Sequence, residues 1–223
     1  MRPHTALLSA CCALAGALLL PSLPARSADG LSLLLVKQGP ELLKEQFDAP
    51  ALPAGWSRNF GKVGIANGAL RASQQASDSH PCAFRRALPL QNAVVRLDFR
   101  FEGAKTLHLG FDPARGELKK QGHLFTVVVS PTRVALQEAA DKANPASKNR
   151  ELASASVTLE GGKWYPLLLE MNGPEVVVQI AGQATLRGSS ADFACKKPGL
   201  VFRALGADDA AAEFDNLQVW EAR

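Results

Sequence analysis

Strict alternation of apolar and polar residues between Val94 and Phe101 is the feature of this chain that most constrains its fold. The side chains at odd positions are all apolar: Val95, Leu97, Phe99 and Phe101. Those at even positions are mostly polar: Val94, Arg96, Asp98 and Arg100. Side chains of a β-strand point alternately to two faces, and no other regular element has that period. The segment is therefore predicted to be a strand with one buried face.

The same period returns at Thr106–Phe111, after the turn Glu102–Lys105, and the two runs predict a hairpin. Further short strands are predicted at 124–129, 133–137, 163–171, 175–180, 199–204 and 212–221. In the last of these, Phe214 is out of phase with Leu217 and Val219, which predicts a β-bulge near Asp215 and Asn216.

Residues 137–155 are rich in alanine and contain Pro145, so they are predicted to form a long loop with at most one helical turn. Many short strands separated by turn residues favour an all-β fold with two packed antiparallel sheets, a jelly-roll sandwich. We expect this to be a single domain that spans residues 29–223.

Residues 1–28 have the composition of a secretory signal peptide. Arg2 precedes an apolar run from Ala6 to Leu20, and small residues follow, so cleavage is expected between Ala25 and Ala28. A secreted or periplasmic location follows from this prediction, without a membrane span in the processed chain. A lipid anchor at Cys11 is disfavoured because most of the apolar run lies after that cysteine.

Two cysteines, Cys82 and Cys195, remain once such a leader is removed. In an oxidising compartment they are expected to pair, which would close a long loop and contribute on the order of 4 to 5 kcal/mol. The alternatives are two reduced, buried thiols or a metal site that uses His80 and Cys82.

Charge gives no indication of a nucleic-acid ligand. The formal net charge is +4, and Arg2 and Arg26 belong to the leader, which leaves +2. The basic pairs are scattered and lack interleaved aromatic residues. No cofactor is indicated, and a calcium site at Asp208 and Asp209 has only weak support because two adjacent acids do not supply enough oxygen ligands.

Several short motifs resemble the 3-keto-disaccharide hydrolase family, whose members have a concanavalin A-like jelly roll. They are Glu45-Gln46-Phe47-Asp48, Gly55-Trp56, the run from Gly61 to Leu70, Gly162-Lys163-Trp164-Tyr165, Asn172-Gly173 and the run from Phe214 to Trp220. The resemblance covers about residues 42–222 and implies the same fold and an activity on an oxidised disaccharide.

The chain departs from this family where activity is concerned. Active members carry an Asn-Ser-Gly strand and then a Glu-Val-Gln strand, and the corresponding places here read Leu107-His108-Leu109-Gly110 and Leu124-Phe125-Thr126-Val127. The Glu-x-Asp-x-x-Glu strand of the related laminarinase-type glucanases does not occur in the sequence. That glucanase mechanism is excluded.

The candidate catalytic residues are His108, His123 and Glu170. His108 is on the solvent-facing parity of its strand, and His123 opens the next strand, so the two would meet if these strands are neighbours. Asp112, Arg85 and Glu170 are candidates to complete the cluster, since a carboxylate orients an imidazole for acid–base work. Ordinary surface histidines are the alternative.

Sugar binding uses exposed aromatic rings among polar groups, and Trp56 is included with Arg85 and Asp112 as a candidate ligand contact. The remaining acids, Glu213 and Asp215, form no recognisable pair, and Asp215 is expected to bond backbone at the bulge. The leading hypothesis is an exported jelly roll that binds carbohydrate or glycoconjugate. The alternatives are a 3-keto-disaccharide hydrolase or lyase and a structural envelope protein, and the oligomeric state is open.

Overall fold

The computed structural model describes residues 30–223, and the expected signal peptide lies outside them. The described residues are almost entirely β-structure, with two short 3₁₀ helices, Ala76–Asp78 and Ala191–Ala194. The strands are β1 Gln38–Glu45, β2 Trp56–Phe60, β3 Lys62–Ala66, β4 Ala69–Ser73, β5 Cys82–Leu90, β6 Ala93–Glu102, β7 Thr106–Phe111, β8 Phe125–Ser130, β9 Arg133–Glu138, β10 Arg150–Ser156, β11 Tyr165–Asn172, β12 Glu175–Ile180, β13 Ala184–Ser189, β14 Lys197–Leu205 and β15 Ala211–Ala222.

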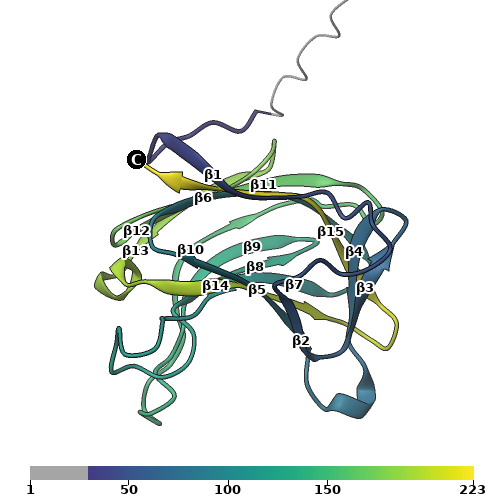
Figure 1. Ribbon diagram of the computed structural model, residues 1–223. Helices are drawn as coiled ribbons and strands as arrows, with labels where there is room; N and C mark the ends of the chain where they lie inside the picture. The colour runs from purple at the N-terminus through teal and green to yellow at the C-terminus, as the bar shows by residue number, and fades with distance from the viewer. Residues whose placement is uncertain (1–29) are drawn as a thin grey trace, which may run out of the picture.

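Two antiparallel sheets lie face to face (Figure 1). Sheet A has eight strands in the order β13-β12-β11-β6-β15-β4-β3, and β1 also pairs with β15. Sheet B has seven strands in the order β10-β9-β8-β7-β14-β5-β2. The predicted all-β jelly-roll sandwich is confirmed.

The alternating pattern correctly predicts which side chains are buried. Phe99 on β6 and Leu109 on β7 are almost fully buried, as are their neighbours of the same parity. The predicted hairpin of these two strands is wrong, because β6 lies in sheet A and β7 in sheet B. The turn between them crosses from one sheet to the other, so their buried faces oppose each other across the core.

Two details of the strands test the sequence pattern further. The bulge near Asp215 is confirmed: the pairing of β15 with β6 shifts between Asp215 and Gln218, and Asn216 has a positive φ of 50°. The predicted long loop at 137–155 is wrong at its end, because residues 150–156 form the edge strand β10. Its side chains are mostly exposed, so it lacks the apolar alternation that identifies the inner strands.

The predicted disulfide between Cys82 and Cys195 is wrong. Both thiols are free and buried. Cys82 begins β5 and pairs with Ala204, whereas Cys195 precedes Lys197, which pairs with Leu90 at the other end of β5. A strand rises about 3.4 Å per residue, so the strand pair separates the two cysteines by roughly 25 Å, and a disulfide needs Cα atoms within about 7 Å.

The N-terminal segment covers part of the outer face of sheet A. Glu170 on β11 is fully buried, and its carboxylate accepts hydrogen bonds from the backbone N–H groups of Leu34, Leu35 and Val36 at 2.8 to 3.1 Å. Gln179 on β12 donates to the carbonyl of Ser32 at 2.6 Å. This segment therefore packs on sheet A as an additional layer. No helix within residues 30–223 is long and apolar enough to cross a membrane.

Candidate functional site

A connected group of polar side chains lies on the outer face of sheet B, on the side away from the core. Its members come from β2, β5, β7, β14 and the segment between β7 and β8, and we call it the histidine cluster: Asn59, Arg85, His108, Asp112, His123 and Arg203. The inner parity of the same strands is apolar, so only the outward positions are available for polar groups.

His123 is held from both sides. Its Nδ1 hydrogen-bonds to Oδ1 of Asp112, and Nη2 of Arg203 donates to its Nε2. A guanidinium has donors only, so Nε2 of His123 accepts in this contact. Both ring nitrogens of His123 are therefore engaged, and neither is free to abstract a proton from a substrate.

Asp112 joins the two halves of the cluster. Its second oxygen accepts a hydrogen bond from Nη2 of Arg85 at 3.2 Å, and Arg85 also donates to Oδ1 of Asn59. Burial alone would raise the pKa of Asp112, but the hydrogen bonds and charges of His123 and Arg85 outweigh it and lower that pKa. Asp112 is thus a fixed acceptor rather than a proton donor.

His108 has ring nitrogens that form no hydrogen bond with any side chain or backbone group of residues 30–223. It lies on β7 directly opposite Arg203 of β14, with Val128 of β8 on its other side. Burial, and then the charges of Arg203 and His123, lower its pKa to about 4. At neutral pH it is an uncharged ring that can both donate and accept a hydrogen bond.

A small cavity of about 130 Å³ adjoins the cluster on the side of Arg85 and Asp112, with Ser57, Pro198 and Val201 in its lining. The side chains of Asp112 and His123 are 20% and 16% exposed, so a ligand at this face would reach them without a change of fold. A cavity of this volume holds only a small group, so the rest of a larger ligand would lie along the open face of sheet B.

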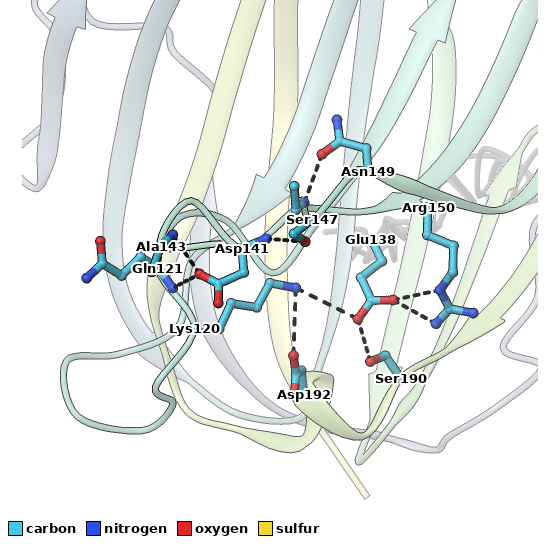
Figure 2. A network of polar contacts seen from close by, with 11 residues as sticks. Lys120, Gln121, Glu138, Asp141, Ala143, Ser147, Asn149, Arg150, Ser190 and Asp192 are labelled. Atoms are coloured by element: carbon cyan, nitrogen blue, oxygen red, sulfur yellow. Dashed lines mark hydrogen bonds and ion pairs between the residues drawn. The ribbon is translucent and has the colours of Figure 1, made fainter. Parts of the chain in front are cut away.

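The loop that carries His123 is fixed by a polar network at one end of sheet B (Figure 2). Oδ1 of Asp141 accepts hydrogen bonds from the N–H groups of Gln121 and Ala143, each at 2.9 Å. Lys120 lies 3.8 Å from Glu138 and 3.7 Å from Asp192, which ties the connection between β7 and β8 to the end of β9 and to the connection between β13 and β14. The Gln121-Gly122 step before His123 is therefore anchored by its neighbours.

The structure brings together some predicted site residues and separates others. His108, His123, Asp112 and Arg85 do gather on one face, as the sequence predicts. Glu170 does not join them, because it lies on sheet A and its carboxylate is bound by the N-terminal segment. The other acids considered, Glu213 and Asp215, are also on sheet A, on β15.

Trp56 is not on the outer face either. Its ring lies 5.4 Å from that of Phe202 and 5.8 Å from that of Phe84, and its indole N–H donates to Glu45 at 2.6 Å. Trp56 therefore packs at the edge of the core. The prediction that Trp56 contacts a ligand is wrong, because the ring does not lie on the outer face. The indole of Trp164, in contrast, lines a groove on sheet A.

Arg203 and Asn59 are the members that the sequence analysis missed. Arg203 interrupts an otherwise apolar strand, Gly199–Ala204, and this lone charge in an apolar run is the signal that could have identified it.

Asp208, considered above as a weak calcium candidate, instead accepts a hydrogen bond from the N–H of Ala76 at 2.6 Å. Within residues 30–223, no three His, Cys, Asp or Glu side chains are grouped as a metal site.

Comparison with known proteins supports the fold. Solved structures similar to this chain include the laminarinase from Rhodothermus marinus, with a TM-score of 0.64 at 11% identity over 85% of this chain and 100% of that one. SCLam, a non-specific endo-β-1,3(4)-glucanase of family GH16, gives 0.63 at 13% identity over 87% and 96%. The carbohydrate-binding module CBM66 from Bacillus subtilis gives 0.58 at 13% identity over 75% and 96%.

These likenesses define the fold class of the protein: its solved neighbours are concanavalin A-like jelly rolls, and the chain shares their fold. At such low identity they show the fold alone. No protein-family model matches the chain. No curated protein matches it either. Membership of the 3-keto-disaccharide hydrolase family stays a prediction.

Proposed function

We propose that this protein is an exported carbohydrate-binding module and that the histidine cluster on the outer face of sheet B contacts the glycan. The observation that carries this proposal is the unbroken chain of hydrogen bonds from Asn59 through Arg85, Asp112 and His123 to Arg203. Such a chain is held in place before a ligand arrives, which lowers the entropy cost of binding.

The chemistry of the cluster suits sugar hydroxyls. A hydroxyl both donates and accepts, so a site for several hydroxyls needs donors and acceptors side by side. Arg85 and Arg203 supply donors, Asp112 supplies acceptor oxygens, and neutral His108 supplies one of each. The related folds named above include a carbohydrate-binding module and glucanases, which agrees with a glycan ligand.

Binding is favoured over catalysis for two reasons. A general base is most effective when its pKa lies near the working pH, and the pKa of His108 is about 4. Glycoside hydrolysis also needs two carboxyl groups across the scissile bond, and the acids singled out in the sequence, Glu170, Glu213 and Asp215, all lie on the other sheet.

The test is a glycan array with the purified protein, followed by calorimetric titration of the best ligand. Arg85→Ala and His108→Ala are expected to weaken binding at least ten-fold. Arg133→Ala is the matched control, because Arg133 lies on the same outer face and pairs with one carboxylate, Glu151, but is on β9, two strands away from His108. It is expected to bind like the parent protein.

The alternatives give different results in the same experiment. Turnover of 3-keto-disaccharides or unmodified glycans that disappears in His108→Ala would replace the binding proposal with an enzymatic one. The absence of binding across the array would leave the structural envelope role in its place.

A further inference from the structure

A second polar groove, which the histidine cluster does not reach, lies on the outer face of sheet A. It has a volume of about 610 Å³ and runs between the end of β1, the bulge of β15, the start of β11 and the turn after β12. The residues that matter most for its chemistry are Lys44, Gln46, Arg96, Asp98, Trp164 and Gln218. The N-terminal segment covers Glu170 and Gln179, farther along β11 and β12.

Several donors in this groove have no partner in the protein. The side chains of Lys44, Gln46, Arg96 and Gln218 form no hydrogen bond or ion pair with any group of residues 30–223. Arg96 is the most informative, because it is partly buried between Leu168 of β11 and Gln218 of β15 in the sheet. A guanidinium has five donors, and in this position the groove side is the open direction for an acceptor.

Acceptors in the groove are fewer and are held in place. Nδ2 of Asn216 donates to Oδ2 of Asp98 at 2.8 Å, and Asn216 has the left-handed backbone that the bulge requires. Asp215, the cross-strand partner of Asp98, uses Oδ1 to accept the N–H of Asn216 at 2.6 Å. Burial, and then the charges of Asp98 and Asp48, raise the pKa of Asp215.

The indole of Trp164 adds an apolar surface. The guanidinium of Arg100 lies 4.7 Å from the centre of its ring, which fixes the ring in position, and the ring is partly exposed at the groove. An aromatic ring of this kind packs against the C–H face of a pyranose. A simple inorganic anion would make no use of it.

We propose that this groove binds an acidic saccharide, with the carboxylate of a uronic acid on Arg96 and Lys44. The fork of a guanidinium matches a carboxylate with two parallel hydrogen bonds. Asp98 and Gln218 then contact hydroxyls, and Trp164 contacts the ring. This site is on the opposite sheet from the histidine cluster and does not depend on the function proposed there.

Calorimetric titration of the purified protein with oligogalacturonate at low salt tests the proposal, with a neutral β-glucan oligosaccharide and a sulfated one as comparison ligands. Arg96→Gln is expected to weaken oligogalacturonate binding at least ten-fold, and Arg96→Lys to restore only part of it, because lysine keeps the charge without the fork. Arg187→Gln, on the same sheet but outside the groove, is the matched control and is expected to bind normally.

Three outcomes overturn the proposal: no binding of oligogalacturonate to the parent protein, equal losses in Arg96→Gln and Arg187→Gln, or equal affinity for the neutral oligosaccharide. A stronger response to the sulfated ligand than to oligogalacturonate would overturn the assignment to a carboxylate. Chemical-shift changes at the amides of Gly182 and Asn216 on titration give an independent reading of position. Oligogalacturonate binding that is lost in Arg85→Ala and kept in Arg96→Gln would place this ligand at the histidine cluster and overturn the proposal, so failure at one site is separable from failure at the other.

Discussion

His108 and Arg203 are direct partners across the pairing of β7 with β14, and both point away from the core of the sandwich. Burial opposes the protonation of this imidazole, and the neighbouring cation acts in the same direction. His108 therefore stays neutral at the outer face of sheet B, and stability is expected to depend on pH.

The free energy of unfolding is expected to fall as the pH is lowered from about 6.5 to about 4. In this range the unfolded chain binds a proton at His108 that the folded chain does not, because the folded pKa is about 4 against an ordinary value of 6.5. His108→Gln is expected to remove about 1 to 3 kcal/mol of this fall. Urea unfolding at pH 4.5 and 7 measures it, and an identical pH dependence in both proteins contradicts it.

Glu170→Gln is expected to release the N-terminal segment from sheet A. The variant keeps the shape of the side chain but removes its negative charge: an amide donor replaces the Oε1 that accepts from Leu34, and one neutral oxygen is left for the N–H groups of Leu34, Leu35 and Val36. We expect amide hydrogen exchange at these three residues to accelerate at least ten-fold, and the free energy of unfolding to fall by about 1 to 3 kcal/mol. Glu175→Gln, at an exposed position on β12, is the control and is expected to change neither quantity.

Lys197→Met is expected to lower the free energy of unfolding by at least about 2 kcal/mol. The ammonium of Lys197 is buried and donates to the carbonyls of Gln91, Phe193 and Cys195 at 2.7 to 3.0 Å. Methionine fills the space but leaves three carbonyl oxygens without this donor. Lys196→Met, one residue earlier and exposed, is expected to stay within about 0.5 kcal/mol of the parent protein. Thermal or urea denaturation compares the two, and equal effects would refute the role given to Lys197.

Cys82 and Cys195 are expected to carry free thiols in the purified protein. Alkylation under denaturing conditions without a reductant, followed by peptide mass mapping, should find both residues modified. In the folded protein the reaction should be slow, since burial raises the pKa of Cys82 to about 12 and also raises that of Cys195. A disulfide-linked pair of peptides would show that the strand pairing of β5 with β14 is wrong.

The sequence predicts the strands of this protein better than it predicts their partners. Alternation identifies β6, β7, β8, β9, β11, β12, β14 and β15, because burial of one face imposes a period of two on each. Alternation does not show in which sheet a strand lies. The pattern therefore predicts a hairpin for β6 and β7, whereas the turn between them passes from one sheet to the other. The same lack of pairing information made the disulfide plausible.

The site was predicted in part for a similar reason. Asp112 and His123 are close in the sequence and lie on one loop, so their meeting could be expected. Arg203 reaches His123 only because β14 lies beside β7, a pairing of segments about a hundred residues apart. Glu170 looked like an available acid because nothing in its own strand shows that a distant segment covers it.

Both ends of the described chain lie on the same side of the sandwich. Lys37 and Arg223 exchange two backbone hydrogen bonds next to sheet A, so the chain enters and leaves there (Figure 1). A protein immobilised through either end would therefore turn its sheet B face toward the surrounding medium. Binding assays on a solid support would then report the histidine cluster readily, while the groove around Arg96 would lie toward the support and would be measured more reliably in free solution.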